Sequence, residues 1–147
     1  MAHFAVPAHI LTGKDALAEA VPYMKECGRR ALIVTGKHVG KSPMMYLLKK
    51  ALMEAGITYD VFDGITGEPT DQMIEEGVKQ FRKSESEFVI GIGGGSPLDS
   101  AKAIAAMAVN EGNIADYNGK EITGKMPGIV AIPTTAGTGS EATKFTI

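Results

Sequence analysis

Runs of consecutive apolar residues take turns along the chain with stretches of helical spacing. Buried strands are predicted where short apolar or β-branched runs occur, at residues 30–35, 57–62, 88–92 and 128–132. Between these runs, apolar residues recur three and four positions apart, which predicts helices over 44–55, from 69–70 through Phe81, and over 96–109. A weaker helical pattern covers 14–27, where Pro22 is expected to bend or break the helix.

Two of the predicted helices have defined apolar faces. One face consists of Met44, Leu47, Leu48, Ala51, Leu52 and Ala55, before a stop at Gly56, and the other of Ile74, Gly77, Val78 and Phe81. Strands separated by such helices predict an α/β fold: an open, doubly wound, Rossmann-like parallel sheet covered on both faces. The length fits about one domain, residues 1–147. On such sheets, ligands bind beyond the carboxyl ends of the strands.

The end of the chain has a pattern of its own. Residues 142–147 are typical of one more strand, and the chain stops inside it. We therefore expect a piece of a longer protein, with an open strand edge at 145–147 that invites self-association. The alternative is a terminal strand that pairs within the sheet.

The strongest chemical signal follows the predicted strand at 88–92. Gly93, Gly94 and Gly95 are consecutive and lead into the next helix. Backbone without side chains can turn sharply and bring its N–H groups close to an anion. A tight strand-to-helix turn without a ligand is the alternative, but three glycines exceed what one turn needs.

The start of that helix supports an anion site. Ser96 is expected at the N-cap, Pro97 at the first helical position and Asp99 at N3, which together make a Ser-x-x-Asp capping box. The unpaired N–H groups and the positive end of the helix dipole then favour a phosphate. Lys102, about one turn further on, could reach the same oxygens.

Three glycine patterns resemble known nucleotide-binding motifs and depart from them in detail. Residues 91–96 lack the third glycine of the dinucleotide fingerprint and follow a late strand. Residues 137–142 have the fingerprint spacing but precede β-branched residues instead of a helix. Residues 36–42 resemble a Walker A loop that is one residue too short, which argues against a P-loop phosphotransferase.

A second cluster, residues 132–143, follows the predicted strand at 128–132. It offers four threonine hydroxyls, those of Thr134, Thr135, Thr138 and Thr143, and a flexible glycine-containing backbone. Hydroxyls can bond both ribose and phosphate without adding charge. A threonine- and glycine-rich surface loop is the alternative.

The two clusters together resemble the iron-containing alcohol dehydrogenase family. The motifs are Gly-Gly-Gly-Ser-Pro-Leu-Asp-Ser-Ala-Lys at 93–102 and Pro-Thr-Thr-Ala-Gly-Thr-Gly-Ser-Glu at 133–141, and the similarity extends over essentially the whole chain. The resemblance implies an NAD(P)-dependent oxidoreductase that interconverts alcohols with aldehydes or ketones. It also implies two domains, of which this chain is the N-terminal nucleotide-binding one and a helical metal-binding domain would follow.

The resemblance also implies which residues hold the cofactor. The glycine run and the serine after it would hold the pyrophosphate, the charged residues of the next helix would lie near the nicotinamide, and the threonines would line the adenosine and phosphate crevice. The implied cofactor-binding residues are Gly36, Gly93, Gly94, Gly95, Ser96, Asp99, Lys102, Thr134, Thr135, Thr138 and Thr143.

Gly36 departs from the commonest pattern of the family. Many members have an Asp at this place, where it can bond the adenosine ribose and repel a 2′-phosphate. Here Lys37 and Lys41 follow the glycine instead. A missing anion and nearby cations lead to the hypothesis that NADP is tolerated as well as NAD.

No metal-binding or catalytic residue is predicted within the chain. The family's metal ligands, one Asp and three His, lie in its second domain, so iron or zinc is expected only in the full-length enzyme. His3, His9 and His38 lack the i, i+4 spacing of a metal-binding pair, and Cys27 is the single cysteine. We expect the 147 residues alone to bind cofactor weakly and to leave alcohol unchanged.

Composition and charge exclude other classes. Fifteen Lys and Arg against seventeen Asp and Glu give a net charge of −2, which leaves no cationic excess for nucleic acid. The sequence shows neither a signal peptide nor a membrane-spanning run, so a cytoplasmic protein is expected. Two alternatives to the dehydrogenase remain open: a non-catalytic nucleotide-binding module, and a relative on the same fold such as a glycerol dehydrogenase or maleylacetate reductase.

Overall fold

A single sheet organises the molecule. The computed structural model describes residues 10–11, 16–108, 127–134 and 145–146. Within them the strands are β1 (Ile10–Leu11), β2 (Arg30–Val34), β3 (Thr58–Phe62), β4 (Phe88–Gly93), β5 (Gly128–Pro133) and β6 (Phe145–Thr146). Their order is β1-β6-β5-β4-β2-β3, in which β5, β4, β2 and β3 are parallel and β6 is antiparallel to both β5 and β1.

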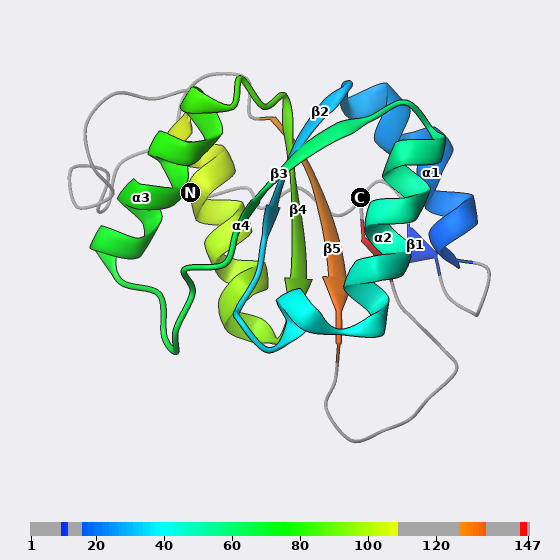
Figure 1. Cartoon of the computed structure of the whole chain (residues 1–147). Helices are drawn as coiled ribbons and strands as arrows, with labels where there is room; N and C mark the ends of the chain where they lie inside the picture. Colours follow the sequence, from blue (N-terminus) through cyan, green and yellow to red (C-terminus); the bar gives the residue numbers. More distant parts are fainter. Residues whose placement is uncertain (1–9, 12–15, 109–126, 135–144, 147) are drawn as a thin grey trace.

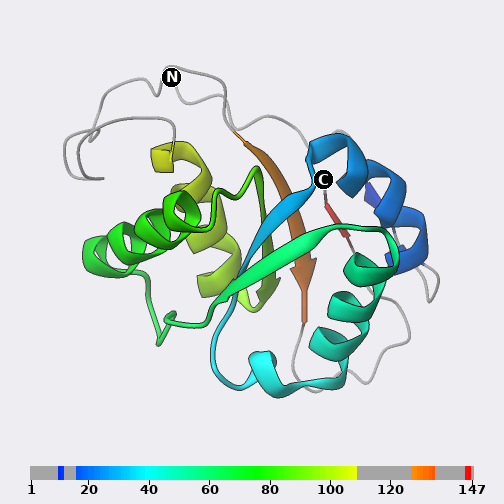
Figure 2. The same cartoon turned by 45° about the horizontal axis from the view of Figure 1, so that its top comes forward.

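Helices cover both faces of the sheet (Figures 1 and 2). They are α1 (Ala16–Cys27), α2 (Pro43–Glu54), α3 (Asp71–Lys83) and α4 (Gly95–Ala108), with a short 3₁₀ helix, η1 (Val39–Lys41), before α2. Alternate residues of β2 enter different cores: Ala31 and Ile33 pack with α1 and α2, whereas Leu32 and Val34 pack with α3 and α4. This alternation confirms the predicted doubly wound α/β class.

The predicted apolar faces have different outcomes in α3 and α2. All four predicted residues of α3 are buried, and the Thr70 hydroxyl caps the helix by accepting the Met73 N–H at 3.2 Å. In α2, Leu48 and Leu52 are buried as expected, but Leu47 is 47% exposed and Met45 takes the core position. Apolar residues flank the Leu48–Leu52 stripe on both sides, so the helical period alone does not decide which flank faces the sheet.

The structure corrects two further expectations. Pro22 does not break α1, and both Pro22 and Ala18 are exposed, so water can bond the Ala18 carbonyl that proline leaves without a partner. The strand at 145–146 is not an edge, because β6 pairs with β5 on one side and with β1 on the other. Among the described strands, the edges of the sheet are β1 and β3.

The order of the parallel strands places a topological switch point between β2 and β4. After β2 the chain passes through α2 to β3 on one side, and α3 then returns it across the sheet to β4 on the other side of β2. Strands β2 and β4 are therefore neighbours whose onward connections cover opposite faces. Such a reversal opens a ligand crevice at the carboxyl ends of the two strands.

No helix in the described part of the chain is long and apolar enough to cross a bilayer.

Candidate functional site

The residues that directly follow β2, β4 and β5 come together at the carboxyl edge of the sheet, at the bottom of the molecule in Figure 1. After β4, the position of a Cβ on Gly93 would lie 3.7 Å from Val39 Cγ2, in η1 after β2. After β5, the Thr134 N–H donates to the Gly93 carbonyl at 2.9 Å. The glycine turn therefore lies between η1, which follows β2, and Thr134, which directly follows β5.

Gly93 is required by the backbone itself. Its φ is +137°, a conformation that residues with a side chain rarely adopt. A Cβ here would also lie only 3.0 Å from Pro97 Cγ. This glycine lets β4 turn sharply into α4, as the sequence predicts.

Gly94 and Gly95 are different, since the fold does not require them. Neither has a positive φ, and a Cβ on either would have nothing within 4 Å. Both are exposed at the crevice. Two adjacent glycines with no conformational or packing reason are suited to a ligand that approaches the backbone closely. The residues present thus fit the diphosphate of a dinucleotide.

The predicted capping box is wrong. Helix α4 begins at Gly95, and the Leu98 N–H donates to the Gly94 carbonyl at 3.3 Å, which makes Gly94 the N-cap. Asp99 is therefore the fifth helical residue and is exposed, too far along to cap. Pro97 is tolerated because the first N–H groups of a helix have no partner within it.

The earlier start frees backbone donors at the crevice. Within the described part of the chain, no acceptor is bonded to the N–H of Gly95 or of Ser96. Pro97 has no N–H to offer. Two donors and the positive end of a fourteen-residue helix are thus available to an anion beside the glycine turn.

Thr35 also contributes to this site, although no sequence motif indicates it. It is fully buried directly after β2, and its hydroxyl donates to the Ile92 carbonyl at 2.8 Å. Its own N–H donates to the Phe62 carbonyl at 3.0 Å, so the residue links β3, β2 and β4 at their carboxyl ends. The available signal was a hydroxyl at the end of an otherwise apolar strand.

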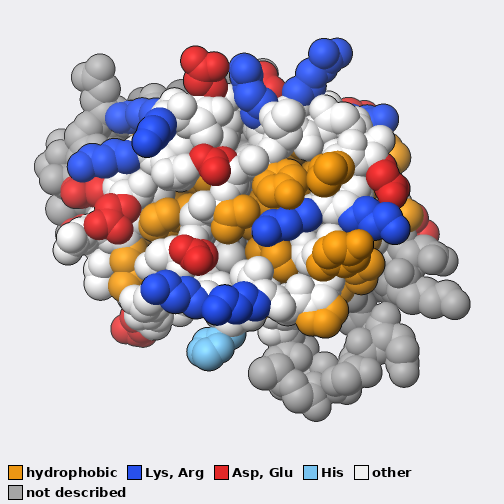
Figure 3. All heavy atoms as spheres, in the orientation of Figure 1, with side chains coloured by type: hydrophobic (Ala, Val, Ile, Leu, Met, Phe, Trp, Pro, Cys, Tyr) orange, Lys and Arg blue, Asp and Glu red, His pale blue; other side chains and the backbone are white. Residues whose placement is uncertain are grey.

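The loop after β2 brings glycine and cations to the same edge. Gly36 is half-buried, and a Cβ on it would lie 3.2 Å from the Ile65 carbonyl oxygen, which is closer than most side chains allow. Lys37 and Lys41 are exposed on this loop, and Figure 3 shows Lys and Arg side chains along the lower rim of the molecule. Positive potential therefore borders the crevice on the β2 side.

The structure brings together Gly36, Gly93, Gly94, Gly95, Ser96 and Thr134 of the predicted site. Lys102 is exposed and lies about 10 Å along the helix axis from Gly95, two turns instead of one, because α4 starts earlier than expected. Thr135, Thr138 and Thr143 lie outside the described residues.

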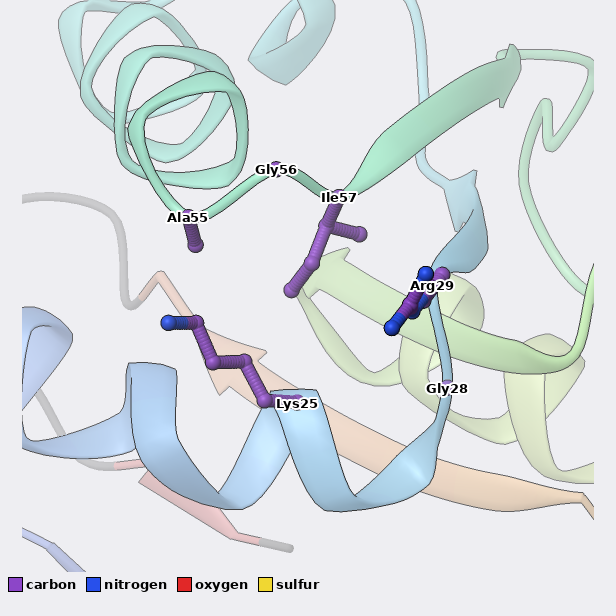
Figure 4. Close-up of a pocket in the computed structure, with 6 residues that line it drawn as sticks. All are labelled: Lys25, Gly28, Arg29, Ala55, Gly56 and Ile57. Carbon is purple, nitrogen blue, oxygen red and sulfur yellow. The ribbon is translucent and has the colours of Figure 1, made fainter.

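A cavity of about 410 Å³ lies at the opposite, amino edge of the strands (Figure 4). Lys25 and Arg29 line it together with Ala55, Gly56 and Ile57. Helices α1 and α2 both end here, so the two cations lie at the negative ends of two helix dipoles, which accounts for them without a ligand.

Nothing in the described residues is suited to a metal ion. No group of three His, Cys, Asp or Glu side chains comes together among them. Cys27 is half-buried, and burial is the main factor that raises the pKa of its thiol, which disfavours the thiolate form that binds metals. The part of the chain that the structure describes therefore does not fit the metal that the resemblance implies.

This geometry defines an α/β domain with a glycine turn and unbonded backbone N–H groups at the switch point of its sheet. Residues 7–147 match the family model of the iron-containing alcohol dehydrogenases, and the chain belongs to this family. It is 40% identical to Alcohol dehydrogenase 4 of Schizosaccharomyces pombe over 98% of its own length and 35% of the relative's. It is 36% identical to the NAD-dependent methanol dehydrogenase of Bacillus methanolicus over its whole length and 39% of the relative's.

Solved structures agree with this assignment. An iron-containing alcohol dehydrogenase of Thermotoga maritima is similar with a TM-score of 0.81 and 34% identity over 95% of this chain and 39% of that one. A 1,3-propanediol oxidoreductase gives a TM-score of 0.79 at 34% identity, over 94% of this chain and 38% of that one. The chain thus spans less than two fifths of the length of the relatives it matches.

Proposed function

We propose that this chain is the dinucleotide-binding part of a metal-dependent alcohol dehydrogenase that interconverts alcohols with aldehydes or ketones. The observation that carries the proposal is the pair Gly94 and Gly95, since neither has a positive φ and a Cβ on either would meet nothing within 4 Å. Their position at the switch point of the sheet supports the same function. The name of the Bacillus methanolicus relative, an NAD-dependent methanol dehydrogenase, is consistent with it.

The chain's own residues would bind and orient the cofactor. A bound nicotinamide dinucleotide supplies the hydride chemistry of such an enzyme. The free N–H groups of Gly95 and Ser96 would hold the diphosphate, and the helix dipole of α4 would favour its charge. Gly93 holds the turn that aims these groups. No described side chain is assigned an acid–base role.

The test of cofactor binding is the Gly95→Ala variant. The added methyl group would fall where the diphosphate approaches, so affinity for NADH and for ADP should drop by at least about tenfold. Because the Cβ meets nothing in the protein and alanine favours helix, the melting temperature should equal or exceed that of the unaltered chain. Fluorescence titration with NADH and thermal unfolding by circular dichroism measure the two quantities.

Gly93→Ala is the matched contrast, since it should destabilise the fold itself through the positive φ and the contact with Pro97. If Gly95→Ala bound NADH as tightly as the unaltered chain, the diphosphate would not lie over this turn and the proposed function would lose its main support.

We also propose that the crevice accepts NADPH as well as NADH. Gly36 offers no carboxylate to repel a 2′-phosphate, and Lys37 and Lys41 lie exposed on the same loop. We expect NADPH to bind with an affinity within about tenfold of that of NADH, and Lys37→Gln with Lys41→Gln to weaken NADPH binding more than NADH binding. Paired titrations at low and high salt measure this, and a strong preference of the unaltered chain for NADH would refute it.

Alcohol turnover is expected to need more than these 147 residues. The described residues hold no candidate metal cluster. We therefore expect the purified chain to bind cofactor without reducing it when alcohol and a divalent metal are added. Alcohol-dependent formation of NADH or NADPH, followed at its absorbance band, would contradict this expectation.

A further inference from the structure

We infer that Thr35 is the positioning residue that holds the glycine turn in its anion-binding conformation. The inference rests on the proposed function, because it concerns the same crevice. The Thr35 side chain is fully buried and cannot itself touch a ligand. Its role would be to control how well the turn binds a diphosphate.

Thr35 lies where the two central strands separate. The register of β2 with β4 runs from Ala31 opposite Phe88 to Val34 opposite Gly91, and it ends there. Beyond this pair the two strands share no further register, so backbone pairing no longer fixes the end of β4 on its β2 side. The Thr35 hydroxyl replaces the missing backbone donor by bonding the Ile92 carbonyl at 2.8 Å.

The bond from Thr35 to Ile92 acts directly beside the glycine turn. Ile92 directly precedes Gly93, whose φ of +137° starts the turn, and Gly95 opens α4 only two residues later. On its other side the turn is held by the bond from the Thr134 N–H to the Gly93 carbonyl. The two bonds fix adjacent carbonyls from the two neighbouring strands, so the turn is anchored on both sides.

The two branches of the threonine side chain reach different loops. While its hydroxyl holds β4, its Cγ2 methyl lies 3.8 Å from where a Cβ on Gly40 would be, under the loop that follows β2. One buried side chain therefore bonds the end of β4 and lies close to the loop that follows β2. A rigid turn binds an anion more tightly than a mobile one, because less conformational freedom is lost on binding.

Removing the hydroxyl should loosen the turn. Valine has nearly the shape of threonine but leaves the Ile92 carbonyl buried without this donor, which the backbone can relieve only by moving. The N–H groups of Gly95 and Ser96 would then no longer point toward the same anion. Serine keeps the donor and loses only the methyl group.

The experiment compares ADP with AMP on the full 147-residue chain. In Thr35→Val, affinity for ADP should fall on the order of tenfold, whereas affinity for AMP should fall much less, because the second phosphate depends on the aim of the turn. Thr35→Ser should restore the ratio of ADP to AMP affinity. Thr58→Val is the matched control: it removes a hydroxyl that donates to the Arg29 carbonyl at 3.3 Å, at the opposite edge of the sheet, and should leave the ratio unchanged.

All variants are titrated calorimetrically, well below their unfolding midpoints. Thr35→Ala, which also lacks the hydroxyl, replaces Thr35→Val if that variant does not fold. An unchanged ratio in the variant, an equal loss for both nucleotides, or a failure of serine to restore the ratio would overturn the role of Thr35. If the unaltered chain bound neither nucleotide, the proposed function itself would fail, and this inference with it.

Discussion

Ser100 is a polar side chain that the fold buries without using. It lies in α4 with no exposed surface, and within the described part of the chain its Oγ has no hydrogen-bond partner. A desolvated hydroxyl without a partner costs free energy, and alanine is the better helix former. We predict that Ser100→Ala leaves the free energy of unfolding unchanged or raises it by about 1 kcal/mol, as measured by urea denaturation.

Ser42 provides the control for this prediction. Its hydroxyl donates to the Val39 carbonyl at 2.7 Å and accepts the Met45 N–H at 3.3 Å, which caps α2. Ser42→Ala should therefore cost about 1 kcal/mol of stability. A comparable loss in Ser100→Ala would show that the Ser100 hydroxyl does have a role in the fold.

Glu87 makes the stability of the fold depend on pH. Its carboxylate accepts the Arg29 backbone N–H at 2.7 Å, and this bond is the main factor that lowers its pKa below the usual 4.5. The stability that it adds is fully present above that value and is lost as the pH falls through the lowered pKa. We predict that Glu87→Gln is less stable than the unaltered chain at pH 7. The difference should vanish at strongly acidic pH in paired denaturation curves.

At the scale of elements, the close packing of α3 on α4 depends on Gly77. A Cβ at this position would clash with Ile104 Cδ1 and lie 2.8 Å from Ile104 Cγ1. We predict that Gly77→Ala destabilises the fold by about 1–3 kcal/mol through this overpacking. Ile104→Val removes the Cδ1 atom, so the double variant should be more stable than the sum of the single effects implies. Strict additivity in chemical denaturation would contradict this packing.

The same scale shows what the sequence can and cannot predict. The apolar face of α3 was readable because its buried residues form one isolated stripe. The start of α4 could not be predicted. Ser96 and Asp99 have the spacing of a capping box, and this spacing is the same whether the helix begins after Ser96 or already at Gly95. The glycine turn was found because it is local, whereas the bond from Thr35 to Ile92 joins residues 57 positions apart and exists only once the strands are paired.

For the whole molecule, we still predict self-association, but through helix α2 instead of the strand at 145–146. The strand at 145–146 is paired on both sides, but α2 exposes large apolar side chains: Tyr46 is 67%, Leu47 47% and Met53 70% exposed. Figure 3 shows hydrophobic side chains on this face among Lys and Arg side chains. We expect the chain to associate as its concentration rises, driven by burial of these groups.

Light scattering over a concentration series measures this association. Met53→Lys combined with Leu47→Lys should reduce it, whereas a charge change on the exposed side of α3, Lys79→Glu, should leave it unchanged. A stable monomer at the highest concentrations would refute the expectation.

Strand β3, at an edge of the described sheet, carries the charged residue Asp60. Thr58 and Phe62 bond β2 through their backbone, so Val61, one position out of phase with them, directs its N–H away from the sheet. The Asp60 side chain accepts that N–H at 3.2 Å and also bonds Gln80 of α3. Without this carboxylate, residues 58–62 would be an uncharged run of strong β-formers. The Val61 N–H would then be an unbonded donor on β3, at an edge of the described sheet. We therefore expect Asp60 to disfavour fibril-like stacking of a nascent or partly unfolded chain on its neighbours.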